Sequence, residues 1–104
     1  MFIGDAGITY QSSEGERILV VGWHVHPQFR SLGYATEAAQ TCMTFGFERL
    51  QAGALCSIVD PANTASIKVA KRVHEGWRTY AGKRGPMLLF STTSAEFAAR
   101  PTLP

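Results

Sequence analysis

The sequence contains few cysteines, and neither is spaced for metal binding. Cys42 and Cys56 are the two cysteines, and each lies in an apolar stretch outside any CxxC pair. No Cys/His spacing typical of a zinc site is present. Buried free thiols are therefore the expected state of both residues, and such thiols are typical of a reducing compartment. We expect no metal cofactor and a cytoplasmic protein.

A secretory signal and long apolar runs are also absent from the sequence. Met1 is followed by Phe, Ile, Gly and Asp rather than by a basic stretch and an apolar run. No segment approaches the roughly 20 apolar residues that a membrane-spanning helix needs. We therefore expect a protein with no membrane partner.

Neither positive nor negative charge dominates the sequence. The 104 residues carry a formal net charge of +2, and the ten Lys and Arg residues are spread from Arg17 to Arg100. A nucleic-acid-binding domain gathers its basic residues on one face, so we expect no nucleic-acid partner. Hydrophobic residues make up 45% of the chain and charged residues 17%, which excludes a disordered chain and is typical of one folded domain.

Two hydrophobic patterns alternate along the chain and predict a mixed α/β fold. Short apolar runs bounded by turn residues predict strands, and apolar residues at helical spacing predict helices. The expected order is β-β-α-β-α-β-β: strands over 2–10 and 17–26, a helix over 34–50, a strand over 54–59, a helix from about 64 to 73, and a hairpin of strands over 77–80 and 87–91. The strands on either side of the first helix are expected to be parallel. Residues 1–91 would form the domain, and 92–104 a loosely ordered tail.

The second predicted helix has two faces. Either Asn63 or Thr64 would cap its start, and Ile67, Ala70 and Val73 are expected to face the core. The polar positions that remain are expected to form a solvated face: Lys68, Lys71, Arg72 and His74.

The segment between the second strand and the first helix carries the clearest chemical signal. The strand stops at Pro27, a short loop contains Arg30 and Gly33, and a helix opens directly after it. The first N–H groups of a helix have no partner within the helix, and the helix dipole makes them a site for anions. Gly33 lets the backbone approach an anion, and Arg30 adds a charged donor. The pattern predicts a cradle for a phosphate or a diphosphate.

Other interpretations of this segment stay open on the residues alone. A glycine before a helix also serves as ordinary turn chemistry, and the helix start could bind another phosphate ligand. The segment matches neither the GxGxxG pattern of dinucleotide-binding folds nor the GxxxxGK[ST] pattern of P-loop ATPases, so both of those classes lose support.

The same segment resembles the GNAT superfamily of N-acetyltransferases. Arg30-x-x-Gly33-x-Ala35 is similar to the Q/R-x-x-G-x-G/A signature of that family. The wider run over 26–38 resembles the branch related to ribosomal-protein N-acetyltransferases. A second block over 59–67 is similar to that branch's second motif and follows at the expected distance. The resemblance covers residues 3–90 and implies a GNAT-like domain that binds acetyl-CoA.

The resemblance also implies roles for individual residues. Backbone N–H groups of the loop and helix start would hold the coenzyme A diphosphate, and the edge of the preceding strand would pair with the pantetheine arm. Asn63 would hydrogen-bond the same arm, and Ser66 would donate a proton to the departing thiolate. The residues implied for the diphosphate are Arg30, Ser31, Leu32, Gly33, Tyr34 and Ala35, and those implied for the strand edge are Trp23, His24 and Val25.

The sequence departs from the family pattern at two places. Many members carry a general-base glutamate on the strand before the loop, where residues 18–21 are all aliphatic here. His24 or His26 could replace it because histidine titrates near neutral pH, although each could instead be a strand histidine satisfied by its neighbours. The first strand and helices of the family fold have no counterpart before 3–8, so we expect a fold truncated at the N-terminus. Its exposed flank would favour association, for example as a homodimer.

Two functions follow from the resemblance. The first is transfer of an acetyl group from acetyl-CoA to a primary amine, such as a protein N-terminus or a small molecule, by direct attack in a ternary complex. The second is a catalytically incompetent CoA-binding remnant or interaction module. The short N-terminus and the missing glutamate favour the second.

Overall fold

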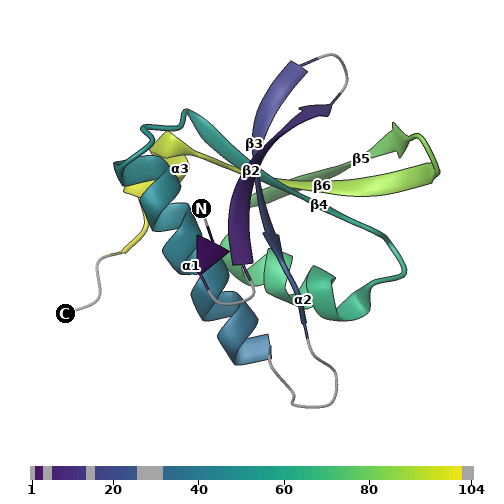
Figure 1. Ribbon diagram of the computed structural model, residues 1–104, viewed down its shortest axis with the longest axis horizontal. Coiled ribbons are helices and arrows are strands. Elements are labelled where there is room, and N and C mark those ends of the chain that lie inside the picture. The colour runs from purple at the N-terminus through teal and green to yellow at the C-terminus, as the bar shows by residue number, and fades with distance from the viewer. Residues whose placement is uncertain (1, 4–5, 14–15, 26–31, 102–104) are drawn as a thin grey trace.

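The apolar runs of the sequence form the strands of one mixed sheet. The structure, a computed structural model, describes residues 2–3, 6–13, 16–25 and 32–101. Within them six strands lie in the order β1-β2-β3-β4-β6-β5 (Figure 1). Their bounds are β1 Phe2–Ile3, β2 Ala6–Ser13, β3 Glu16–Trp23, β4 Ala54–Val59, β5 Gly76–Gly82 and β6 Gly85–Thr93.

Parallel pairing occurs where the strand–helix–strand unit predicts it. β3 and β4 are parallel neighbours, and helix α1 (Leu32–Glu48) lies between them in the chain. The pairs β1–β2, β2–β3, β4–β6 and β5–β6 are antiparallel. The predicted mixed α/β fold is therefore confirmed, and β4 has the predicted bounds.

The main core lies between the sheet and two helices. α1 and α2 (Thr64–Val73) contact each other, and their apolar faces pack with the helix-facing side chains of β2, β3 and β4 in one cluster. Gly46 allows α1 to approach β4 closely, since a Cβ at Gly46 would lie 2.8 Å from Cδ1 of Leu55. A smaller cluster of Val59, Ala70 and Phe90 joins α2 to the sheet.

The structure corrects the bounds of three predicted elements in the first half of the chain. The strand expected over 17–26 is β3, which ends at Trp23. The strand expected over 2–10 is two antiparallel strands, β1 and β2. The helix expected over 34–50 begins two residues earlier, at Leu32, and ends at Glu48. A pattern of apolar residues locates a helix face better than its ends, because capping and the first turn decide where it starts.

The segment expected to be a loosely ordered tail is folded up to residue 101. β6 continues to Thr93, and α3 (Ser94–Ala98) follows it. Thr93 and Glu96 form a capping box at the start of α3, and the Phe47 and Phe97 rings stack with centroids 4.6 Å apart. A reciprocal cap and an aromatic contact order this segment despite its alanine-rich sequence. None of the helices in the described part of the chain is long and apolar enough to span a membrane.

Candidate functional site

β3 and β4 are neighbours in the sheet, but they separate towards their C-terminal ends. Within the described residues, one pair, Val20 with Cys56, sets their parallel register. Beyond it, β3 runs towards the segment before α1, whereas β4 runs towards α2 (Figure 1). The separation leaves a cavity of about 160 Å³, which we call the cleft; it is lined by Val21, Gly22, Trp23, Ser57, Ile58, Val59, Asp60, Asn63 and Ser66.

One wall of the cleft is the edge of β3. This strand pairs with β2 on its other side as far as Trp23. At Gly22 an added Cβ would meet no heavy atom within 4 Å, so nothing crowds the backbone there. A strand edge of this kind offers N–H and C=O groups to an extended ligand. The glycine inside the strand thus corresponds to an open approach, as a glycine in a strand often does.

The other wall is the turn from β4 into α2. Asn63 is the N-cap of α2, and its side-chain oxygen accepts a hydrogen bond of 3.1 Å from the Ser66 N–H. Asp60 Oδ1 accepts a hydrogen bond of 2.8 Å from the Ala62 N–H. Ser66 is buried and lines the cleft. These local bonds fix the turn, so the start of α2 borders the cleft in one defined position.

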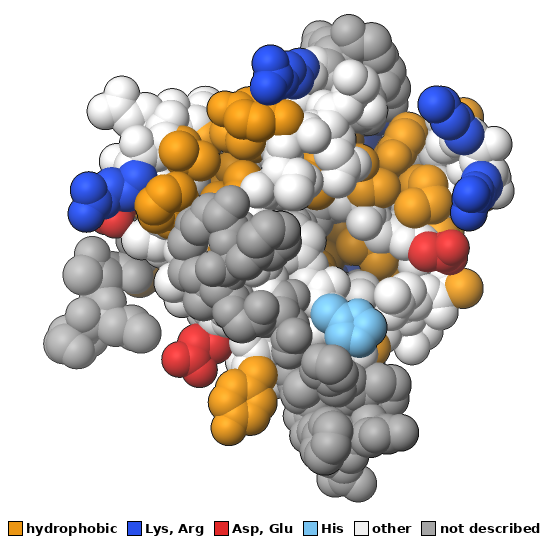
Figure 2. Space-filling view, in the orientation of Figure 1, with side chains coloured by type: hydrophobic (Ala, Val, Ile, Leu, Met, Phe, Trp, Pro, Cys, Tyr) orange, Lys and Arg blue, Asp and Glu red, His pale blue; other side chains and the backbone are white. Residues whose placement is uncertain are grey.

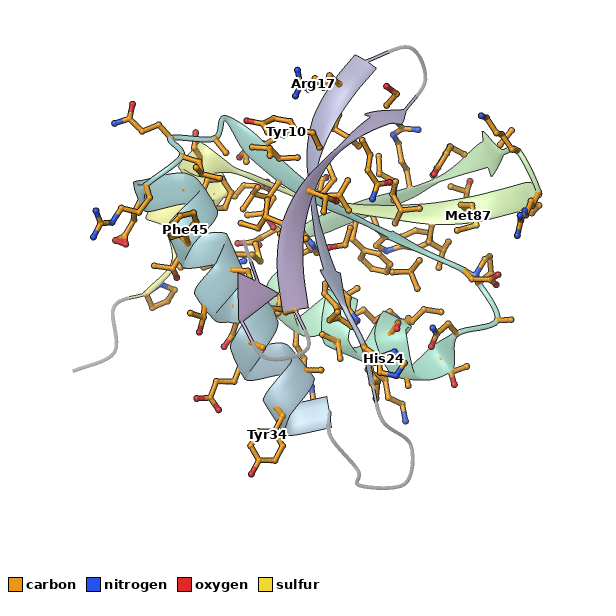
Figure 3. All side chains as sticks on the ribbon, viewed as in Figure 1. Tyr10, Arg17, His24, Tyr34, Phe45 and Met87 are labelled. Carbon is orange, nitrogen blue, oxygen red and sulfur yellow. The ribbon has the colours of Figure 1, made fainter. Side chains whose placement is uncertain are left out.

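The start of α1 supplies the second part of the site. The first N–H groups of an α-helix have no acceptor within it; in α1 these include the N–H groups of Leu32, Gly33 and Tyr34. Gly33 is exposed, and a Cβ there would meet no heavy atom within 4 Å. Tyr34 is 79% exposed and projects from this end of α1 (Figure 3). The backbone at the start of α1 is therefore open to a ligand.

The predicted site residues fall into three groups. Trp23, Asn63 and Ser66 all line the cleft. His24 follows the end of β3 at the surface (Figure 3), whereas Val25 packs against the main core. His26, Arg30 and Ser31 lie outside the described residues.

Ala35 has a different neighbourhood from the one its motif position predicts. Its side chain is 2% exposed and belongs to the main core. Its small size therefore serves the contact between α1 and the sheet. As the fourth residue of α1, Ala35 also lies past the N–H groups that have no acceptor in the helix, so the structure does not favour it for binding an anion.

A second hollow lies next to the cleft. It has a volume of about 180 Å³ and is lined by Ala6, Gly7, Thr9, Gln11, Val20, Gly22, Trp23 and His24. Gly22 and Trp23 line both spaces, so this stretch of β3 separates the hollow from the cleft. His24 is the one histidine among the residues that line either space.

Sequence reasoning missed two residues that lie beside the cleft. The Ser57 hydroxyl donates a 2.6 Å hydrogen bond to the Val21 carbonyl, across the gap between β4 and β3. His74 Nε2 lies 2.8 Å from Ser57 Oγ. A serine inside the apolar run ALCSIV was the available signal for Ser57, since a buried hydroxyl needs a partner.

The prediction that His74 belongs to a solvated helix face is wrong. His74 is buried at the C-cap of α2. Burial, together with the positive charge of Arg100, lowers the pKa of His74 to about 4, against the opposing influence of Glu75. The imidazole is therefore neutral near pH 7. Its place four residues after Ala70 was the available signal, because such residues share a helix face.

The cysteines, the possible metal ligands and the basic side chains are distributed as follows in the structure. Cys42 and Cys56 are free and buried, as predicted, and burial raises the pKa of both thiols. Among the described residues no group of three or more His, Cys, Asp or Glu side chains could hold a metal ion. On the face in Figure 2 the Lys and Arg side chains lie at the edges of the view rather than in one patch.

Comparison with known proteins places these features in a family. Residues 1–74 match the family described as "Acetyltransferase (GNAT) domain". The chain is 36% identical over 72 residues to the Bacillus subtilis (strain 168) protein named "Uncharacterized protein YkkB", a match that covers 69% of this chain and 42% of that protein. The chain therefore belongs to the GNAT acetyltransferase family, and it spans less than half the length of this relative.

Solved structures share the fold. An acetyltransferase of the GNAT family from Bacillus anthracis is similar with a TM-score of 0.68 and 23% identity, over 88% of this chain and 60% of that one. A putative ribosomal-protein-serine acetyltransferase from Vibrio cholerae is similar with a TM-score of 0.59 and 28% identity, over 73% of this chain and 48% of that one. The predicted resemblance to the family and to its ribosomal-protein branch is thus confirmed.

Proposed function

We propose that this chain binds acetyl-CoA and transfers its acetyl group to a primary amine. The observation that carries the proposal is the combination of a β3 edge that lines the cleft at Gly22 and Trp23 with a helix start at Gly33, where an added Cβ would meet no heavy atom within 4 Å. A cleft of about 160 Å³ is too small for a nucleotide, but it suits a narrow extended arm. A diphosphate outside the cleft, at the start of α1, completes the fit.

The chain's residues divide the binding between two places. The N–H groups of Leu32, Gly33 and Tyr34 would hold the diphosphate, because a helix start attracts anions. The backbone from Trp23, the last residue of β3, to Val25 would pair with the amides of the pantetheine arm. The Asn63 side-chain oxygen already accepts from the Ser66 N–H, so its NH₂ group is the part that would donate to the arm.

The reaction itself needs only modest chemistry from the chain. Acetyl-CoA supplies the acetyl group as a thioester, and the amine nitrogen bonds to its carbonyl carbon as the carbon–sulfur bond breaks. Holding donor and acceptor together supplies most of the acceleration. Ser66 lines the cleft and would give a proton to the sulfur. His24 lines the adjacent hollow and is the described candidate for removing the ammonium proton, with His26 as the second candidate.

The acceptor would enter from the hollow beside β3. Gly22 and Trp23 line both spaces, so the hollow and the cleft border each other along this stretch of β3. The likeness to a putative ribosomal-protein-serine acetyltransferase favours a peptide α-amine as the acceptor class.

Two assays test this function. Calorimetric titration with acetyl-CoA should show binding, and ATP should compete weakly or not at all. Thiol release from acetyl-CoA should then depend on an added amine, with peptides of free N-terminus compared with polyamines and amino acids. Preference for ATP over acetyl-CoA would contradict the proposal.

A CoA-binding module without activity is the second candidate. The chain spans 42% of the relative named YkkB, and many family members use a glutamate where residues 18–21 are aliphatic here. Binding of acetyl-CoA without thiol release on any amine would favour this second candidate.

A further inference from the structure

A chain of polar side chains runs from the cleft into the folded C-terminal segment. Ser57 Oγ donates to the Val21 carbonyl over 2.6 Å, and His74 Nε2 lies 2.8 Å from the same oxygen. On the other side of the ring, Nδ1 lies 2.9 Å from Thr92 Oγ1. Ser57, His74 and Thr92 are 1%, 8% and 0% exposed. Three buried polar side chains from β4, α2 and β6 thus meet behind the cleft.

The proton count fixes the direction of these hydrogen bonds. Ser57 has one hydroxyl proton, and the Val21 carbonyl can only accept, so Ser57 donates to Val21. Nε2 of His74 must then donate to Ser57 Oγ. The ring is neutral near pH 7, since its pKa is lowered to about 4, and Nδ1 is left as an acceptor for the Thr92 hydroxyl. The geometry therefore selects the Nε2–H tautomer of His74.

The outer end of this chain is consistent with that assignment. Thr92 Oγ1 can also donate to Glu75 Oε1, 3.1 Å away, and its one hydroxyl proton serves either Glu75 or His74. We assign the proton to His74, because the 2.6 Å contact of Ser57 with the Val21 carbonyl needs the Ser57 proton and so makes Nε2 of His74 a donor. Arg100 pairs with Glu75, with Nη2 to Oε1 at 2.6 Å and Nε to Oε2 at 2.9 Å. The carboxylate is therefore satisfied by Arg100 when Thr92 donates to His74.

The inner end of the chain lies where β3 and β4 part. Val20 and Cys56 are the register pair in the described residues, and Val21 and Ser57 are the next residue on each strand. The Val21 carbonyl is bonded by a side-chain hydroxyl from β4. Beyond it, both strands line the cleft. The hydroxyl therefore bridges the two strands at the point where the cleft begins.

We propose that Ser57, oriented by His74, is a positioning residue that ends the pairing of β3 with β4 and so sets the opening of the cleft. It bonds one carbonyl of β3 and leaves the edge at Gly22 and Trp23 open to a ligand. This assignment rests on the proposed function only for the identity of that ligand. Neither residue touches the ligand in this account; both act through the spacing of the two strands.

The test compares two ligands with different demands on the cleft. One is coenzyme A, and the other is its nucleotide half without the pantetheine arm, which would use the start of α1 alone. Ser57→Ala should weaken coenzyme A binding about tenfold, the effect of losing one partner of a buried hydrogen bond, and leave binding of the nucleotide half unchanged. The exposed Ser12→Ala on β2 is the matched control and should change neither.

Two variants of His74 distinguish the effect of its N–H donor on Ser57 from the effect of its side-chain volume. His74→Gln keeps an N–H donor near the position of Nε2 and should retain coenzyme A affinity within about threefold of the unsubstituted chain. His74→Leu removes the donor and should reproduce the loss seen with Ser57→Ala. Equal weakening of both ligands by Ser57→Ala and His74→Leu would indicate general loosening of the fold and overturn the proposal.

Two measurements without ligand test the role of Ser57 separately from the proposed binding of acetyl-CoA. Nitrogen-15 NMR of the ring should show a protonated Nε2 and an unprotonated Nδ1 in His74. Amide exchange at Gly22, Trp23 and Val59 should change in Ser57→Ala and not in Ser12→Ala. If the unsubstituted chain fails to bind coenzyme A, the proposed function fails and these signals still decide the role of Ser57. The opposite tautomer, or unchanged exchange, would overturn that role.

Discussion

The two halves of the β3–β4 pair are built for different purposes. Before and around the Val20–Cys56 pair the strands are packed, and Val21 and Leu55 are fully buried against the helices. Beyond that pair the strands part, and four of the nine residues that line the gap are polar: Ser57, Asp60, Asn63 and Ser66. The packed half stabilises the fold, and the parted half forms a binding space. Substitutions in the two halves should therefore change different measurements.

The largest expected effect is at the start of α1, which completes the open half. Gly33→Glu places bulk and a negative charge where the diphosphate would bind, so acetyl-CoA affinity should fall at least about a hundredfold. The fold should survive, because a carboxylate in the first turn suits the helix dipole. Calorimetric titration measures the affinity, and a thermal melt checks the fold. Gln40→Glu, exposed in the middle of α1, is the matched control and should bind normally; equal binding by both variants would contradict the prediction.

The packed half is tested by Leu55→Ala. Leu55 is fully buried in the main core and contacts the space above Gly46, so its truncation leaves a cavity and should lower the free energy of unfolding by about 3 kcal/mol. Urea denaturation measures this change. The partly exposed Leu50→Ala is the control and should change stability by less than about 0.5 kcal/mol. Equal effects at the two leucines would contradict the packing described here.

The pH dependence of stability tests the buried His74. Its pKa in the folded chain is about 4, below the ordinary value of 6.5, so the unfolded chain takes up a proton first as the pH falls. Stability should therefore be fully present above about pH 7 and be lower by about 3 kcal/mol at pH 4. Denaturation at several pH values should show this slope, and His74→Gln should flatten it. His24→Gln, at an exposed histidine, should leave the slope nearly intact; loss of the slope there instead would contradict the assignment.

The smallest expected effect is that of Ser66→Ala, which should change turnover without changing acetyl-CoA affinity. Ser66→Ala removes the hydroxyl but keeps the N–H that bonds Asn63, so the cap of α2 stays in place. Turnover should fall about tenfold as a proton donor is lost, while acetyl-CoA affinity stays the same. Thiol-release kinetics and calorimetry measure the two quantities. A parallel fall in both would assign Ser66 to binding rather than to proton transfer.

Much of the fold could be predicted from local patterns. The run ALCSIV gave the bounds of β4, and Asn63 was one of two expected caps for α2. The tail was misjudged because the cap between Thr93 and Glu96 and the contact of Phe97 with Phe47 join residues that periodicity does not relate. The reversal between β1 and β2 was missed for the same reason.

The candidate site was predicted in part. The motif residues Asn63 and Ser66 proved to line one space with Trp23, although they are distant from it in the sequence. The family resemblance implied a free strand edge for the pantetheine arm, but the bond between Ser57 and Val21 could not be predicted, because it joins residues 36 positions apart. His74 was assigned to the solvent because its neighbours Lys71 and Arg72 are charged. Its spacing of four residues from the buried Ala70 indicates instead that the His74 side chain lies on the buried face.

The most direct test of the central claim is an NMR titration of the nitrogen-15-labelled chain with coenzyme A. We predict that the amide resonances of Gly22 and Trp23 on β3 and of Gly33 and Tyr34 on α1 shift together and follow one binding curve. The chemical shifts of amides on the packed side, such as that of Leu55, should not change. Saturable shifts confined to other parts of the chain, with those of Gly22 and Gly33 unchanged, would contradict the claim that the parted strands and the helix start form one binding site.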